Sequence, residues 1–267
     1  MSSFFLPYLK SRFHIITSGT GEELLICLHG FGENAESYSR LHDTLGTHYT
    51  IVSLDLPLHG QTEWKEERAF AMEDLKEVIL LILQHYRFKT FSLMGYSMGG
   101  RVSLCVVQLL AERIDRLYLL APDGLKDNRW HMFATQTAIG KWLFRYCTYH
   151  PQLFFGLLHA WRKLRLISRG LHKFAFNSMD TLEKRERVYF VWTCMGQMMP
   201  DRELCKQQLK THRVQTLLLF GKYDRVIPPV LGIRFMDGTF PCEMRVLERG
   251  HQLISEEAAE VITAYIF

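Results

Sequence analysis

Short apolar segments that end at turn residues alternate with helix-like segments through the first 124 residues of the chain. Each apolar segment is hydrophobic throughout instead of alternating with polar residues, a pattern typical of strands that are covered on both faces. Strands that alternate with helices indicate βαβ units and a parallel sheet. We therefore predict the α/β fold class, with a mostly parallel sheet flanked by helices. The predicted strands are 23–28, 49–54, 91–94 and 117–120, and the predicted helices are 34–45, 71–86 and 99–110.

The alternation stops near residue 125, and the sequence then has a mostly helical pattern up to residue 200. It resumes with apolar runs at 214–220 and 242–247, followed by a final helical pattern. A chain of 267 residues is long enough for one large domain with an insertion. We expect an α/β core domain made of residues 1–124 and 201–267, interrupted by a helical cap insertion at 125–200.

The five residues from Gly95 to Gly99 read Gly-Tyr-Ser-Met-Gly and fit the G-x-S-x-G pattern. A predicted strand enters this segment and a predicted helix leaves it, which is the context in which the pattern marks a nucleophile. So tight a turn needs strained backbone angles at the serine, and the two flanking glycines let the strand and the helix approach each other. The sequence therefore predicts Ser97 as a nucleophile at a helix N-terminus, where developing negative charge is favoured.

A serine hydroxyl needs a neighbouring base before it can act as a nucleophile. His251 is the candidate base, because it follows the last predicted strand and comes after Ser97 and an acid in chain order. Asp224 and Asp123 each follow a predicted strand, where functional groups converge in a parallel sheet. We favour Asp224 as the orienting acid, because Asp123 precedes a glycine and otherwise resembles a turn residue. Glu248 is close to His251 in sequence, but adjacency does not set the geometry.

The oxyanion of a tetrahedral intermediate needs two preorganised hydrogen-bond donors. The first expected donor is the backbone N–H of Met98, the residue after the nucleophile. The second is expected from the loop His29-Gly30-Phe31-Gly32, which follows the first predicted strand. We assign it to the backbone N–H of Phe31.

With these motifs the chain resembles the α/β-hydrolase superfamily, in a form with a serine nucleophile and an inserted helical cap. The turn after the second predicted strand departs from the family pattern, with Leu58 in place of a glycine and Thr62 in place of a serine. A serine at position 97 argues against the related dehalogenases and epoxide hydrolases, which use aspartate there. The expected Ser-His-Asp chemistry implies no metal and no organic cofactor, and the spacings of His and Cys match no zinc motif. The resemblance rests on residues 29–32, 55–60, 95–100, 221–224 and 250–251.

The favoured function is that of a serine hydrolase of the carboxylesterase class, which cleaves a carboxylic ester through an acyl-enzyme. The string from Gly95 to Arg101 also resembles the elbow of menaquinone-pathway lyases, which eliminate pyruvate from an anionic cyclohexene carboxylate. That resemblance implies a substrate contact at Arg101, and Tyr96 is a further candidate contact. A structural ion pair is the alternative for Arg101. A third alternative for the whole chain is a non-enzymatic, ligand-binding member of the fold.

The charges are unevenly distributed along the chain. The whole chain has 32 Lys and Arg against 28 Asp and Glu, a balance that argues against a nucleic-acid binder. Residues 125–200 hold twelve of the basic residues but only four of the acidic ones. This insertion could be a solvated basic surface, attract an anionic small-molecule substrate, or dock on an anionic membrane surface. Its aromatic residues are expected to be mostly core, with some of them lining a pocket for an apolar acyl group.

The sequence also bears on localisation. The opening residues lack the basic and apolar regions of a secretory signal, and no apolar stretch is long enough for a membrane span. The six cysteines form no C-x-x-C pattern, and free thiols are favoured over disulfides. We expect a cytoplasmic protein.

Overall fold

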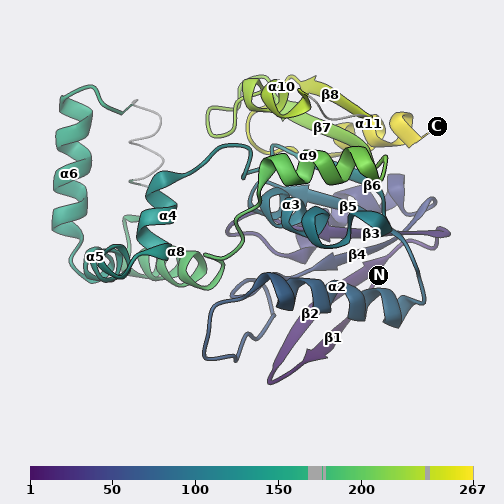
Figure 1. Ribbon diagram of the computed structural model, residues 1–267, viewed down its shortest axis with the longest axis horizontal. Coiled ribbons are helices and arrows are strands. Elements are labelled where there is room, and N and C mark those ends of the chain that lie inside the picture. The colour runs from purple at the N-terminus through teal and green to yellow at the C-terminus, as the bar shows by residue number, and fades with distance from the viewer. Residues whose placement is uncertain (168–175, 177–178, 238–240, 267) are drawn as a thin grey trace. The chain divides into compact units, whose positions relative to one another are not determined.

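The computed structural model describes residues 1–167, 176, 179–237 and 241–266. Within these residues the strands form one eight-stranded sheet in the order β1-β2-β4-β3-β5-β6-β7-β8 (Figure 1). The pairs from β4 through β8 are parallel, and the two pairs that involve β2 are antiparallel. The predicted mostly parallel sheet is confirmed. The strands are β1 (Ser2–Tyr8), β2 (Ser11–Ser18), β3 (Glu23–Leu28), β4 (Tyr49–Leu54), β5 (Phe91–Tyr96), β6 (Ile114–Leu120), β7 (Gln215–Gly221) and β8 (Cys242–Leu247).

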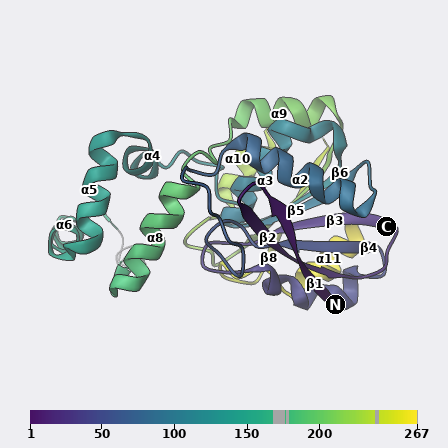
Figure 2. The same ribbon diagram turned by 90° about the horizontal axis from the view of Figure 1, so that it is seen from below.

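Helices cover both faces of the sheet (Figure 2). Helix α3 contacts α2 and α9 on one face, and α11 contacts α1 and η1 on the other. The central strands β3, β5, β6 and β7 are therefore almost entirely buried, as their unbroken apolar sequence requires. The helices are η1 (Ala35–Leu41), α1 (His42–Leu45), α2 (Met72–Tyr86), α3 (Met98–Leu110), η2 (Ala111–Arg113), α9 (Arg202–Thr211), α10 (Val230–Met236) and α11 (Glu256–Ile266).

Two features differ from the sequence-based expectation. The chain begins with the antiparallel hairpin β1–β2, for which no strand was predicted. Leu9 in its turn has a φ of 50°, a conformation that glycine or asparagine usually supplies. The turn contains neither residue, so the sequence gives no sign of the hairpin. The segment 34–45, expected as one helix, consists of the seven-residue 3₁₀ helix η1 and the four-residue α1.

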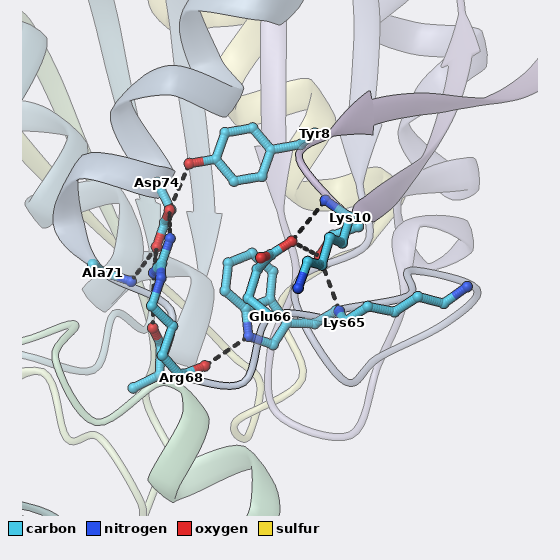
Figure 3. Close-up of polar contacts among 10 residues, drawn as sticks. Tyr8, Lys10, Lys65, Glu66, Arg68, Ala71 and Asp74 are labelled. Atoms are coloured by element: carbon cyan, nitrogen blue, oxygen red, sulfur yellow. Dashed lines mark hydrogen bonds and ion pairs between the residues drawn. The ribbon is translucent and has the colours of Figure 1, made fainter.

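The loop before α2 is fastened to the hairpin by Asp74 (Figure 3). Its carboxylate accepts hydrogen bonds from the Tyr8 hydroxyl at 2.5 Å, from Arg68 Nη2 at 2.6 Å and from the Ala71 backbone N–H at 2.8 Å. Burial acts to raise the pKa of Asp74, but the hydrogen bonds from Arg68 and Tyr8 outweigh it and lower the pKa. Burial and the Asp74 carboxylate raise the pKa of Tyr8 to about 12. The ionised Asp74 therefore fixes the start of α2 against the hairpin.

The chain divides into two compact units, one made of 1–127 and 198–267 and the other of 128–197. In the second unit, Phe144 of α5 lies against the rings of Tyr189 and Trp192 of α8. Arg185 of α8 is buried and its Nε donates to the Thr148 carbonyl at 2.8 Å. The expected role of this insertion as a cap stays a prediction. The helices of this unit are α4 (Arg129–Gln136), α5 (Ala138–Tyr149), α6 (Pro151–Lys163) and α8 (Leu182–Cys194).

None of the helices in the described part of the chain combines the length and the hydropathy needed to cross a membrane.

Candidate active site

Ser97 occupies the turn between β5 and α3. Its φ of 50° and ψ of −115° lie outside the regions that L-amino acids usually adopt. The two glycines that flank the turn have no space for a side chain. A Cβ on Gly95 would lie 2.5 Å from the Gly99 carbonyl oxygen, and one on Gly99 would lie 1.8 Å from the Leu28 carbonyl oxygen. The strained turn therefore depends on glycine on both sides, and it presents the Ser97 side chain at the start of α3.

Three of the predicted site residues are joined by hydrogen bonds. The Ser97 Oγ lies 3.0 Å from His251 Nε2, and His251 Nδ1 lies 2.7 Å from Asp224 Oδ2. An ionised carboxylate only accepts hydrogen bonds, so the proton of the neutral imidazole sits on Nδ1. His251 Nε2 is then free to accept the hydroxyl proton of Ser97. The three side chains predicted as nucleophile, base and orienting acid are therefore hydrogen-bonded in series, and their catalytic roles stay predictions.

The environment of Asp224 keeps its carboxyl ionised. The side chain is fully buried, and burial acts to raise the pKa of Asp224. The hydrogen bond from His251 and the backbone N–H groups of Ile227 and Val226 outweigh burial and lower the pKa below its ordinary value. Asp224 Oδ1 accepts from these two N–H groups at 2.9 Å and 2.7 Å. The loop after β7 thus holds one carboxylate oxygen and leaves the other for His251.

The other two acids considered from the sequence have different partners. Asp123 Oδ1 accepts from the Gly124 N–H at 2.8 Å, and its Oδ2 lies 3.5 Å from Arg101 Nη1. Glu248 accepts from Lys222 Nζ at 2.6 Å and from the Tyr223 hydroxyl at 2.7 Å. Among the three acids considered for the orienting role, the structure pairs Asp224 with His251.

The loop after β3 lies beside Ser97. A Cβ on Gly30 would come within 3.4 Å of the Ser97 Cβ and 3.0 Å of the Tyr96 ring. His29 Nε2 accepts from the Leu56 N–H at 3.0 Å, so its other nitrogen carries the proton and donates to the Gly30 carbonyl at 2.8 Å. The C=O and N–H of one trans peptide point in opposite directions. His29 therefore turns the Gly30 carbonyl toward itself and the Phe31 N–H away from itself.

Met98 is the first residue of α3. The first N–H groups of a helix have no acceptor within the helix, so the Met98 N–H is available to a ligand oxygen next to Ser97. The roles of Met98 and Phe31 as oxyanion donors stay predictions.

A hydrogen-bonded bridge that the sequence analysis missed connects the end of β5 with two loops of the site. The buried Tyr96 donates its hydroxyl proton to Gln252 Oε1 at 2.6 Å, and Gln252 Nε2 donates to Glu33 Oε1 at 2.9 Å. Burial and the nearby Glu33 and Asp224 carboxylates raise the pKa of Tyr96, which keeps its hydroxyl protonated. The bridge ties the residue before Ser97 to the residue after His251 and to the loop of Phe31. Adjacency to the predicted nucleophile and base is the only sequence signal that could have found it.

Arg101, the other candidate substrate contact, is 6% exposed in α3. The Arg101 side chain packs closely against Gly124, since a Cβ added to Gly124 would lie 3.1 Å from Arg101 Cγ. Its guanidinium lies beside the Asp123 carboxylate. A substrate contact by Arg101 or by Tyr96 stays a prediction.

A hollow of about 450 Å³ lies elsewhere, near the N-terminal strands, and His14, Ile16, Glu36 and Gln61 help to line it. It contains none of the predicted site residues, so the candidate site rests on the hydrogen-bonded groups around Ser97. Within the described residues, no cluster of three or more His, Cys, Asp or Glu side chains is arranged to hold a metal ion.

The family model described as the alpha/beta hydrolase fold matches residues 23–258, and the chain belongs to this family. The chain is 27% identical over 263 residues to the protein called "Uncharacterized hydrolase YugF" of Bacillus subtilis (strain 168), covering 92% of this chain and 89% of that one. It is 30% identical over 116 residues to the pimeloyl-[acyl-carrier protein] methyl ester esterase of Sodalis glossinidius (strain morsitans), covering 43% of each. Its fold is similar to that of a thermophilic esterase from Thermogutta terrifontis (TM-score 0.69, 18% identity, 96% of this chain and 93% of that chain).

Proposed function

We propose that this protein is a serine hydrolase that cleaves a carboxylic ester through an acyl-enzyme. The observation that carries the proposal is the continuous hydrogen-bonded series from Asp224 through His251 to the Ser97 Oγ, at 2.7 Å and 3.0 Å. The similarity to a methyl ester esterase over 43% of the chain supports the same class of reaction.

The proposed reaction begins with proton transfer from Ser97 Oγ to His251 Nε2, while the oxygen attacks the ester carbonyl carbon. The Phe31 and Met98 N–H groups hold the resulting oxyanion. When the tetrahedral intermediate collapses, the carbon–oxygen bond to the alcohol breaks, and His251 gives its proton to the departing oxygen. His251 then takes a proton from a water molecule, whose oxygen attacks the acyl carbon. The bond between that carbon and Ser97 Oγ breaks, His251 returns the proton to Ser97 Oγ, and the acid is released. Asp224 holds the imidazole tautomer and stabilises the imidazolium throughout.

The proposed substrate is a small molecule with an apolar acyl group or an anionic group. Turnover of a series of p-nitrophenyl esters, sorted by acyl length and by charge, tests the reaction and the substrate class together. Ser97→Ala and His251→Ala are each expected to lower kcat by about 10⁴-fold or more. Ser39→Ala is the matched control, because Ser39 is an exposed serine outside the hydrogen-bonded series. Equal loss in the control, or activity that survives in Ser97→Ala, would contradict the proposal.

The lyase alternative depends on Arg101 reaching a substrate carboxylate. We favour the ester hydrolase because the Arg101 side chain is 8% exposed and lies 3.5 Å from Asp123. Release of pyruvate from the anionic cyclohexene carboxylate, without ester turnover, is the result that would instead favour the lyase. Absence of both reactions in a folded protein would favour a ligand-binding member of the fold.

A further inference from the structure

The unit 128–197 has an unusual distribution of charge. Its first 52 residues, 128–179, contain eight Lys and Arg and no Asp or Glu. At the frequency of the whole chain, 28 acidic residues in 267, a segment of this length would hold about five. Soluble surfaces usually intersperse the two signs of charge. The segment is therefore a source of positive potential, concentrated at 141–145 and 162–173, and this potential attracts an anionic partner.

Helix α5 adds an exposed apolar stripe to this charge. Ile139 and Trp142 are 72% and 66% exposed, and Tyr146 and Tyr149 are each 43% exposed. At about 100° per residue, these four positions fall within about a quarter of the helix circumference. The opposite side of the helix is buried at Gly140 and Thr148. Helix α5 therefore packs into its own unit through that side, and the stripe lies on its exposed side.

Basic residues flank the stripe. Lys141 and Arg145, both exposed, lie one turn apart on α5, between the stripe and the buried side. The next helix, α6, repeats the pattern: Leu153 and Leu157 are 45% and 44% exposed, and its last turn carries Arg162 and Lys163. Neither helix contains an acidic residue, although Glu186 of the neighbouring α8 accepts a hydrogen bond from Tyr149 at one end of the stripe.

Exposed Trp, Tyr and Leu beside Lys and Arg, on helices that contain no acidic residue, have the composition of a helix that lies in a bilayer interface. Trp and Tyr place an apolar ring among the lipid chains and a polar edge among the headgroups. The basic side chains attract anionic headgroups. We propose that the α5 stripe and its flanking cations form a docking surface for anionic phospholipid membranes. The inference does not depend on the proposed ester hydrolysis, because no residue of the candidate active site takes part.

The test is cosedimentation of the full chain with vesicles, using the Ser97→Ala protein so that no turnover alters the lipids. Vesicles of phosphatidylcholine alone are compared with equimolar phosphatidylcholine and phosphatidylglycerol. We expect binding to the anionic vesicles, and we expect that binding to fall as salt is raised, because exposed charges are screened. No binding, or equal binding to both kinds of vesicle, would overturn the proposal.

Two double variants separate the charges from the stripe. Lys141→Gln with Arg145→Gln is expected to weaken binding to anionic vesicles by about 25-fold. Ile139→Ser with Trp142→Ser is expected to weaken it by at least about tenfold. The matched control is Ile233→Ser with Arg234→Gln on α10, where an apolar residue that is 61% exposed adjoins an exposed arginine. Equal weakening by the control pair contradicts a specific surface.

The oligomeric state and the thermal stability of the free protein test the remaining explanation, that the stripe packs against protein. The proposal fails if the protein is a dimer and the Ile139→Ser/Trp142→Ser double variant dissociates it. It also fails if this double variant lowers the midpoint of thermal unfolding, because either result shows that the stripe packs against protein. An unchanged monomer with an unchanged midpoint supports a free docking surface.

Discussion

Replacement of Asp224 by asparagine should remove the orienting acid while preserving the shape of its loop. Asparagine can still accept hydrogen bonds from the N–H groups of Val226 and Ile227, which lie 2.7 Å and 2.9 Å from Asp224 Oδ1. The other side-chain position, 2.7 Å from His251 Nδ1, changes from an acceptor to an NH₂ donor. His251 must then carry its proton on Nε2, where it faces the Ser97 hydroxyl and cannot accept a proton.

This change of tautomer sets the expected magnitude. We predict that Asp224→Asn lowers kcat by about 10⁴-fold, which is about 5 kcal/mol of activation free energy. The Asp224 side chain is fully buried and cannot touch the substrate, so KM should change little. Steady-state hydrolysis of a p-nitrophenyl ester measures both constants, and circular dichroism checks the fold.

Asp123→Asn is the matched control, because Asp123 also follows a strand of the sheet but pairs with Arg101 instead of His251. It should keep kcat within a few-fold of the wild-type value. The reasoning is refuted if Asp224→Asn retains more than about a tenth of the activity, or if the two aspartates prove equally important.

Three further predictions concern the same site. Gln252→Ala breaks the bridge between Tyr96 and Glu33 and should lower kcat about tenfold, the cost of one to two hydrogen bonds that position the loops; an unchanged kcat in ester hydrolysis would contradict a positioning role. Gly99→Ala should lower the free energy of unfolding by about 3 kcal/mol or prevent folding, because its Cβ would overlap the Leu28 carbonyl. Gly156→Ala, in an open position on α6, is the control and should be neutral or stabilising by up to about 1 kcal/mol. Urea titrations that rank the two variants the other way would refute the steric argument. The pKa of Asp224 is lowered in the folded protein, so ionised Asp224 stabilises the fold above the unfolded pKa of about 4, and this contribution is lost as pH falls through the folded pKa. The difference in unfolding free energy between wild type and Asp224→Asn should therefore shrink in acid. A difference that grows in acid would show that the pKa shift has the opposite sign.

Local signals made much of the fold and the tight turn at Ser97 predictable. The strand, the glycines and the helix around Ser97 are contiguous in sequence, so a short pattern contains the whole geometric requirement. The central strands were predictable because burial on both faces leaves an unbroken apolar run. The hairpin β1–β2 was missed because Leu9 adopts a positive φ without the glycine or asparagine that usually marks such a turn.

The remaining parts of the site depend on contacts between distant residues. Asp123 and Asp224 follow the neighbouring parallel strands β6 and β7, so strand position alone cannot separate them, whereas the hydrogen bond to His251 does. Gln252 and Glu33 lie 219 residues apart in sequence. No local pattern encodes a hydrogen bond between residues so far apart. The helical pattern of 34–45 also does not distinguish a 3₁₀ helix from an α-helix.

The central claim is that Ser97 is a nucleophile activated by His251. A fluorophosphonate probe forms a covalent bond with the hydroxyl oxygen of an activated serine, and mass spectrometry locates the adduct. The hydrogen-bonded series predicts a single adduct on the peptide that contains Ser97, and none in His251→Ala. A folded protein that gains no adduct, or that is labelled on a different serine, would contradict it.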